Sequence, residues 1–167
     1  RLIQREKVPV MCGAFNSAVT YPATEIAERN KTPWIVLGAV KDEITQRGFK
    51  YVFRINNKAT YDASEQIEAM KMLAKDTGKA ATRIAMLYEG GDWGRSHAEN
   101  IRKLAKQNSM ELVFDEALPA HQVDLTSQLL KIRASRPDAL IVALYTPDQL
   151  VFTRQVAQQK VNIPYGV

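Results

Sequence analysis

The groups of this 167-residue chain that could bind a small polar solute follow short apolar segments. Gly13-Ala14-Phe15-Asn16-Ser17 leads into a predicted helix, whose free N–H groups and positive dipole end suit a carboxylate. In the alternative interpretation, Ser17 or Thr20 only caps that helix. Gly38-Ala39-Val40 follows the next apolar segment, and its small residues would either admit a ligand to the backbone or simply form a turn.

Two aromatic residues follow later apolar segments. Trp93 stands beside glycines in Glu89-Gly90-Gly91-Asp92-Trp93-Gly94, where it would either cover a ligand or pack on the core. This segment lacks the Lys-Ser/Thr pair and the spacing of a phosphate-binding loop. Tyr145 presents a hydroxyl group just before Pro147, which is expected to begin the next helix.

The sequence offers little for catalysis. Paired carboxylates, a metal-spaced set of histidines and a serine with a neighbouring base are missing as motifs, so we predict no catalytic residue, no metal site and no cofactor. The chain is therefore predicted not to be an enzyme. Cys12 is the single cysteine, which excludes an internal disulfide, and its apolar neighbours predict a small buried side chain rather than a nucleophile.

The elements that must position these residues follow from hydrophobic periodicity. Short apolar segments alternate with longer segments of helical period, the pattern of parallel sheets wrapped by helices, so we predict a doubly wound α/β fold. Such sheets bind ligands beyond the carboxyl ends of their strands, where all the candidate residues fall. Strands are predicted over residues 8–13, 34–38, 51–55, 83–88, 111–117 and 139–144, with a last one from about Ile163.

Three helices have recognisable ends. Asp62 and Glu65 resemble a capping box and Gly78 tolerates a left-handed stop, which predicts a helix over residues 61–77. A second helix is predicted over residues 94–108. A third should follow Asp124, whose side chain can cap it.

Composition excludes several classes of protein. With 46% hydrophobic and 25% charged residues the chain can bury a core, and no apolar segment is long enough to span a bilayer. The formal charge of +5 comes from basic residues interleaved with acidic ones, which indicates solvated helix faces rather than a nucleic-acid surface. Because no signal peptide is visible at Arg1, the natural N-terminus is expected to lie outside this sequence.

In order and spacing, the candidate segments resemble those of the branched-chain amino acid binding family, the type I periplasmic binding proteins of ABC transporters. The pattern Gly13-x-x-Asn16-Ser17-x-x-x-x-Pro22-Ala23, followed by Ile26-Ala27-Glu28, is similar to the family's first ligand loop and helix. Tyr51-Val52-Phe53-Arg54 resembles its first crossing between lobes, and Asp92-Trp93-Gly94-Arg95 resembles its second-lobe aromatic element. With residues 124–132, 136–140 and 154–155, the resemblance covers essentially the whole chain.

The resemblance implies a role for each candidate. Ser17 takes the place of the serine that bonds a ligand carboxylate, assisted by backbone groups at Gly38 and Ala39. Trp93 and Tyr145 take the places of second-lobe aromatic residues that close over the ligand. The predicted ligand-binding residues are Asn16, Ser17, Gly38, Ala39, Val40, Trp93 and Tyr145.

One departure from the family bears on the ligand. Val40 stands where amino acid binders usually carry a threonine or serine that contributes to the ammonium site. The loss of that hydroxyl is compatible with an uncharged or aromatic carboxylate. The acidic residue that the family often uses for the ammonium group is expected immediately beyond Val167.

The resemblance also implies the organisation and activity of the protein. Residues 1–56 would form the later part of lobe 1, residues 57–163 most of lobe 2, and residues 164–167 the start of a second hinge crossing. The two lobes, incomplete in this chain, would capture a small solute, an amino acid or a related carboxylate or amide, for delivery to ABC permease subunits. Exposed edges of a partial lobe favour dimerisation of the isolated fragment.

Two other functions remain open on the sequence. A ligand-sensing regulatory protein or a receptor ectodomain would use the same fold. A doubly wound enzyme of the flavodoxin or Rossmann type is a third interpretation, against which the first predicted βα turn lacks G-x-G-x-x-G. The main interpretation places the protein in the periplasm or outside the cell, with a lipid anchor as one means of attachment.

Overall fold

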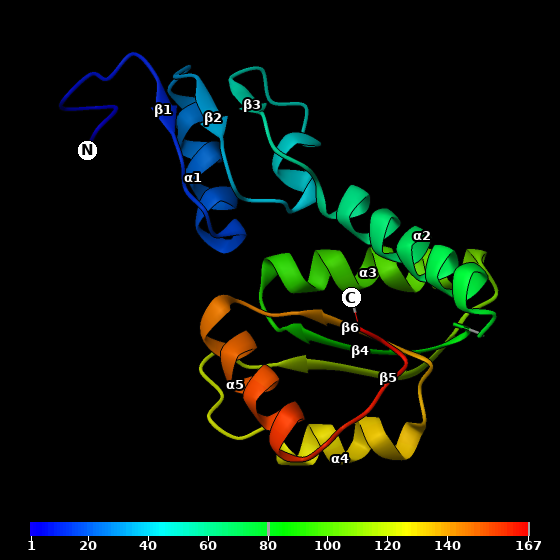
Figure 1. The fold of residues 1–167 in the computed structure, drawn as a ribbon. Coiled ribbons are helices and arrows are strands. Elements are labelled where there is room, and N and C mark those ends of the chain that lie inside the picture. Colours follow the sequence, from blue (N-terminus) through cyan, green and yellow to red (C-terminus); the bar gives the residue numbers. More distant parts are fainter. Residues whose placement is uncertain (80, 167) are drawn as a thin grey trace. The chain divides into compact units, whose positions relative to one another are not determined.

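The computed structural model describes residues 1–79 and 81–166, and the chain divides into two compact units, Arg1–Asp62 and a second that begins at Ala63 (Figure 1). Every strand pair in both units is parallel, and helices flank the sheets. The predicted α/β class is therefore confirmed. Val167, the last residue of the predicted second crossing, lies outside the described residues.

The first unit is a three-stranded sheet in the order β1-β2-β3. Its strands are β1 (Met11–Cys12), β2 (Trp34–Val36) and β3 (Val52–Arg54), with the helix α1 (Ser17–Arg29) and the 3-10 turn η1 (Asp42–Thr45). All three predicted strands are present but shorter than predicted. The strand predicted over residues 8–13 shrinks most, because only two of its residues pair with β2.

One face of this sheet carries the core of the first unit. Trp34, Val36 and Val52 form a buried cluster with Ala27 of α1, and Met11 packs against it. Strand side chains alternate between faces, so Cys12 points to the opposite face from Met11. The predicted burial of Cys12 is therefore wrong, and its side chain is exposed.

The second unit is a four-stranded sheet in the order β5-β4-β6-β7, covered by helices on both faces. The predicted strands over residues 83–88, 111–117 and 139–144 are confirmed, and the last begins two residues after Ile163. The strands are β4 (Arg83–Glu89), β5 (Glu111–Leu118), β6 (Ala139–Ala143) and β7 (Tyr165–Gly166). The helices are α2 (Ala59–Thr77), α3 (Asp92–Gln107), α4 (Thr126–Ser135) and α5 (Thr146–Gln158). None of the helices in the described residues has both the length and the apolar character of a membrane span.

β4 is buried on both faces, as its continuous apolar sequence predicts. Ile84 and Met86 contact a cluster that includes residues of α2 and α3. Ala85 and Leu87 contact a second cluster with residues of α4 and α5. The two helix pairs therefore cover opposite faces of one sheet (Figure 1).

The beginning of α2 differs from the prediction. The helix begins at Ala59, so Asp62 lies within its first turn and the predicted capping box is wrong. Instead, the Asp42 carboxylate accepts hydrogen bonds from the Thr60 N–H, at 3.2 Å, and from the Thr60 hydroxyl. At the other end, Gly78 has a φ of 67°, which confirms the predicted left-handed stop.

The starts of the other three helices of the second unit lie close to their predicted positions. α3 begins two residues before the predicted start at Gly94. The N-cap of α4 is Leu125, so the prediction that Asp124 caps this helix is wrong by one residue, although Asp124 Oδ1 accepts a hydrogen bond from the Thr126 N–H at 2.9 Å. Pro147 lies in the first turn of α5, also as predicted.

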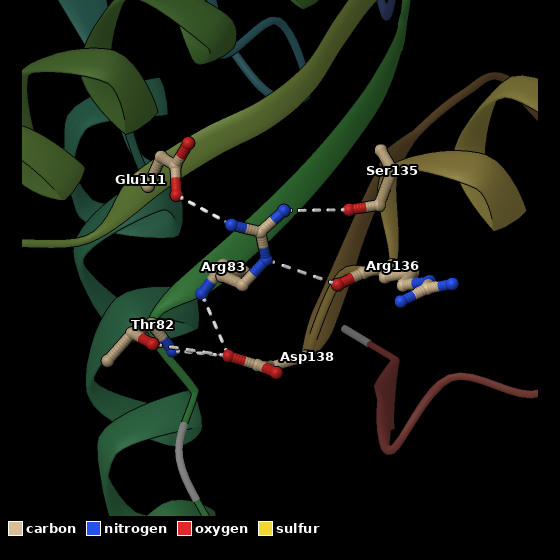
Figure 2. A network of polar contacts seen from close by, with 6 residues as sticks. All are labelled: Thr82, Arg83, Glu111, Ser135, Arg136 and Asp138. Atoms are coloured by element: carbon tan, nitrogen blue, oxygen red, sulfur yellow. Dashed lines mark hydrogen bonds and ion pairs between the residues drawn. The ribbon is translucent and has the colours of Figure 1, made fainter.

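A polar network fastens the amino-terminal ends of three strands in the second unit (Figure 2). Arg83 donates to the carbonyl oxygens of Ser135 and Arg136, at 2.9 and 3.3 Å, which satisfies groups left free at the end of α4. It also pairs with Glu111 at 2.8 Å, while Asp138 Oδ2 accepts from the Arg83 N–H at 2.9 Å. This end of the sheet is thus built for stability, and the candidate loops lie at the other end.

Candidate functional site

In the first unit, the structure brings two predicted ligand segments together. Ser17 Oγ accepts a hydrogen bond from the Lys41 N–H at 3.2 Å, which joins the start of α1 to the loop after β2. Ser17 itself is only 1% exposed. Because its oxygen acts here as an acceptor, the hydroxyl proton remains able to donate to another group.

Asn16 is the N-cap of α1. Its Oδ1 accepts from the Ala18 N–H at 2.8 Å, in the geometry of a side-chain cap. The alternative in which Ser17 or Thr20 caps this helix is therefore wrong. Thr20 lies inside the helix, where its hydroxyl donates to the Asn16 carbonyl oxygen at 2.8 Å.

Three carbonyl groups of the loop after β2, those of Ala39, Val40 and Lys41, are bonded within the first unit. Ala39 O accepts from Arg54 Nη1 at 2.8 Å, and Lys41 O accepts from Arg54 Nη2 at 2.6 Å. Val40 O accepts from the Ala59 N–H at 2.8 Å. By contrast, within residues 1–79 and 81–166 the peptide N–H groups of Gly38, Ala39 and Val40 have no hydrogen-bond partner. The loop therefore has free N–H donors at Gly38, Ala39 and Val40, while its carbonyl groups from Ala39 to Lys41 are already bonded.

Gly38 allows a close approach, but the group that approaches it is a side chain of the same unit. A Cβ at this position would lie 2.7 Å from Cδ2 of Phe15, so the Phe15 ring rests on the glycine backbone. Phe15 is otherwise 74% exposed. The predicted approach of a ligand to this backbone stays a prediction, because the contact observed here is with Phe15.

Arg54 is absent from the predicted site residues, although its side chain donates two hydrogen bonds to carbonyl oxygens of the loop after β2. Burial lowers the pKa of its guanidinium, and the charges of Asp42 and Asp62 oppose that shift. An arginine stays protonated under these conditions, so a positive charge lies behind the loop. The sequence signal that could have identified Arg54 is a lone cation at the carboxyl end of an apolar strand.

In the second unit, the two predicted aromatic residues come together. Trp93, in the first turn of α3, and Tyr145, the N-cap of α5, have ring centroids 4.9 Å apart and planes tilted by 48°. Their loops follow β4 and β6, which are paired in parallel. Trp93 packs part of its ring against the core, and both side chains keep some exposed surface. The core-packing interpretation of Trp93 thus holds in part, and its role as a cover over a ligand stays a prediction.

The sharp turn before Trp93 is closed by a carboxylate that the sequence analysis did not single out. Glu89 accepts from the N–H groups of Gly91 and Gly94, at 2.6 and 2.7 Å, and is 7% exposed. Its negative charge thereby neutralises the positive end of α3. An acidic residue directly before a glycine pair at a helix start is the signal that could have found it.

Tyr145 keeps a neutral phenol group at ordinary pH. Burial raises its pKa to about 12, and the charges of Glu89 and Asp92 contribute in the same direction. A neutral hydroxyl can both donate and accept a hydrogen bond. The nearby carboxylates make this aromatic pair a poor place for a negatively charged group.

The second unit also contains a hollow of about 450 Å³ at the carboxyl ends of β4 and β5, lined by residues 89–91, Arg95 and residues 117–120. Neither Trp93 nor Tyr145 lines it. Among residues 1–79 and 81–166, no group of three or more His, Cys, Asp or Glu side chains could hold a metal ion. Of the two histidines in the sequence, His97 is buried and its Nε2 lies 2.8 Å from Gln66 Oε1.

Sequence comparison identifies related proteins over nearly the whole chain. A family model described as "Periplasmic binding protein" matches residues 1–165. Leu/Ile/Val-binding protein homolog 7 of Brucella suis biovar 1 (strain 1330) is 32% identical over 158 residues, which make up 93% of this chain and 40% of that protein.

Structural comparison shows the same fold in solved proteins. A leucine-binding protein from Thermotoga maritima matches 98% of this chain and 45% of its own, with a TM-score of 0.84 and 21% identity. A solute-binding protein of an ABC transporter from Rhodopseudomonas palustris, in complex with benzoate, matches 99% of this chain and 45% of its own, with a TM-score of 0.85 and 24% identity. The chain spans less than half the length of each of these relatives. Because the family model covers almost every residue, the chain belongs to the periplasmic binding protein family.

Proposed function

We propose that the protein is the substrate-binding component of an ABC transporter, which captures a small carboxylate-bearing solute and delivers it to a membrane permease. The observation that carries this proposal is the set of free N–H groups at Gly38, Ala39 and Val40 beside the Ser17 hydroxyl. Peptide N–H donors suit a carboxylate. The family implies a periplasmic or extracellular location.

The predicted residues take separate roles in this proposal. The N–H groups of the loop and the Ser17 hydroxyl donate to the solute carboxylate. Trp93 and Tyr145 contact its remaining, less polar part, and the neutral Tyr145 hydroxyl supplies one more hydrogen bond. Asn16 contributes indirectly, because its side chain holds the start of α1.

The relatives point to two ligand classes. The Brucella protein is named for leucine, isoleucine and valine, whereas the Rhodopseudomonas structure contains benzoate. Val40 carries no hydroxyl that could bond an ammonium group. We therefore propose an amino acid or a related carboxylate or amide, and the aromatic carboxylates belong among the first candidates.

A thermal-shift screen of the intact protein tests this function. We expect at least one of L-leucine, L-isoleucine, L-valine, benzoate and 4-hydroxybenzoate to raise the melting temperature with increasing concentration. A solute that binds only the folded state stabilises it by about 2.7 kcal/mol at 100 times its Kd. If the protein unfolds cooperatively but none of these carboxylates raises its melting temperature at millimolar concentration, the result would count against the proposal. Solute-stimulated ATP hydrolysis by the reconstituted permease then separates transport from ligand sensing.

The ligand class can be tested at Val40. We expect Val40→Thr to tighten L-leucine binding roughly fivefold, because one new hydrogen bond to an ammonium group contributes about 1 kcal/mol. Benzoate, which lacks an ammonium group, should gain nothing. Calorimetry measures both affinities, and Val19→Thr, at a residue of α1 that is 56% exposed, is the matched control. Unchanged leucine affinity would show that the missing hydroxyl does not decide the ligand.

A further inference from the structure

Arg54 lies at the carboxyl end of β3, behind the loop that presents the free donors. Its guanidinium donates to three carbonyl oxygens, those of Ala39, Asn57 and Lys41, at 2.8, 3.0 and 2.6 Å. Asn56 Nδ2 adds a longer bond to Ala39 O, at 3.3 Å. One side chain thus connects the loop after β2 with the segment that follows β3.

These bonds set the direction of the free N–H groups. In a trans peptide the C=O and the following N–H point in opposite directions across one rigid plane. When Arg54 holds the Ala39 carbonyl, the Val40 N–H must therefore point away from the guanidinium. In the same way, the Ala59 N–H holds the Val40 carbonyl and turns the Lys41 N–H toward Ser17 Oγ.

The positive charge of Arg54, like its hydrogen bonds, favours an anion at the Val40 N–H. The guanidinium donates to the Ala39 carbonyl oxygen, which is the negative end of the Ala39–Val40 peptide dipole. The positive charge of Arg54 therefore lies behind the Val40 N–H, which points away from it. In a partly buried site such a charge is less screened than on the surface. An anion at the Val40 N–H is therefore favoured by the aimed donor and by the Arg54 charge, which the carboxylates of Asp42 and Asp62 partly offset.

We propose that Arg54 is a positioning residue for carboxylate recognition: without touching the solute, it aims the peptide N–H of Val40 at the solute carboxylate. This inference rests on the proposed function. Asp42 assists from the same loop, because its bonds to Thr60 fasten the end of the loop to the start of α2. If Arg54 had only a structural role, its replacement would lower stability and would weaken binding of charged and uncharged ligands equally.

In the intact protein, the test compares a carboxylate with the matching amide, in which an uncharged carboxamide replaces the carboxylate group. Benzoate and benzamide, and L-leucine and L-leucinamide, are titrated calorimetrically into the wild type, Arg54→Met and Arg54→Lys. We expect Arg54→Met to weaken binding of the carboxylate by about 10- to 100-fold, the loss typical of hydrogen bonds to charged groups. The amide should change less than the carboxylate. Arg54→Lys keeps the positive charge but loses the two-pronged set of N–H donors, so its carboxylate affinity should lie between those of the wild type and Arg54→Met.

NMR spectroscopy reports on the Val40 N–H donor directly, through the chemical shift of its amide proton. In the wild type, the carboxylate should move the Val40 amide proton downfield, and this displacement should be reduced in Arg54→Met at saturating ligand. The Trp93 indole resonance should still respond, which shows that the ligand is bound. Arg83→Met is the matched control, because Arg83 also donates to two carbonyl oxygens but lies in the second unit. It should lower stability and leave the preference for carboxylate over amide unchanged.

The outcomes separate the two proposals. Equal loss of carboxylate and amide affinity, or an unchanged Val40 displacement in Arg54→Met, would overturn the role of Arg54 and leave the proposed function standing. If Arg54→Met does not fold, Arg54→Lys decides by the same criteria. A wild-type protein that binds neither benzoate nor L-leucine nor the other carboxylates of the thermal-shift screen would instead contradict the proposed function.

Discussion

Replacing Trp93 by alanine is expected to weaken solute binding at least about 30-fold, because aromatic residues at the centre of a binding site contribute about 2 kcal/mol or more. The Trp93 ring is held against Tyr145 at a centroid distance of 4.9 Å and rests partly on the core, so it is oriented before a ligand arrives. Such a rigid surface binds with little loss of conformational freedom. Calorimetry with the solute identified in the thermal-shift screen measures the effect.

Conservative and distant variants complete this test. Trp93→Phe keeps an aromatic surface and should retain much of the affinity, and Tyr145→Phe removes only a neutral hydroxyl. Tyr61→Ala removes an aromatic ring that is 54% exposed on α2, outside the predicted site, and should leave binding unchanged. Wild-type affinity in Trp93→Ala would remove Trp93 from the site.

Gly94→Ala should destabilise the protein by about 3 kcal/mol, at the upper end of the range for overpacked positions. The added Cβ would lie 2.0 Å from the Glu89 carbonyl oxygen, a backbone atom at the end of β4. Relief requires a shift of the turn, which would disturb the bonds from the Gly91 and Gly94 N–H groups to the Glu89 carboxylate. Urea unfolding monitored by circular dichroism gives the change in the free energy of unfolding.

Gly90→Ala provides a graded control in the same turn. There the added Cβ would lie 3.1 Å from the Leu118 carbonyl oxygen, so a displacement of a few tenths of an ångström is enough. The cost should be about 1 kcal/mol or less, near the average for a point mutation. Equal stability of Gly94→Ala and wild type would contradict the tight turn described here.

The sequence alone was sufficient for the elements and for several of the contacts between them. The apolar segment Ile84-Ala85-Met86-Leu87 predicts a strand buried on both faces, and all four residues are 0% exposed. Parallel strands bring their carboxyl ends to one edge, so loops after neighbouring strands must meet. For this reason Trp93 and Tyr145, and likewise Ser17 and the loop after β2, are brought together as residues that follow strands.

The polar partners, by contrast, were decided by the tertiary structure. Asp42, 18 residues earlier in the chain, accepts the Thr60 N–H at the start of α2, and Arg54 bonds carbonyl oxygens 15 and 13 residues earlier in the chain. Cys12 is exposed because α1 packs on the other face of its sheet. Hydrophobic periodicity depends on neighbours a few residues apart and is visible in the sequence. A long-range hydrogen bond depends on strand order, register and the face that a helix covers, and these exist only once the chain has folded.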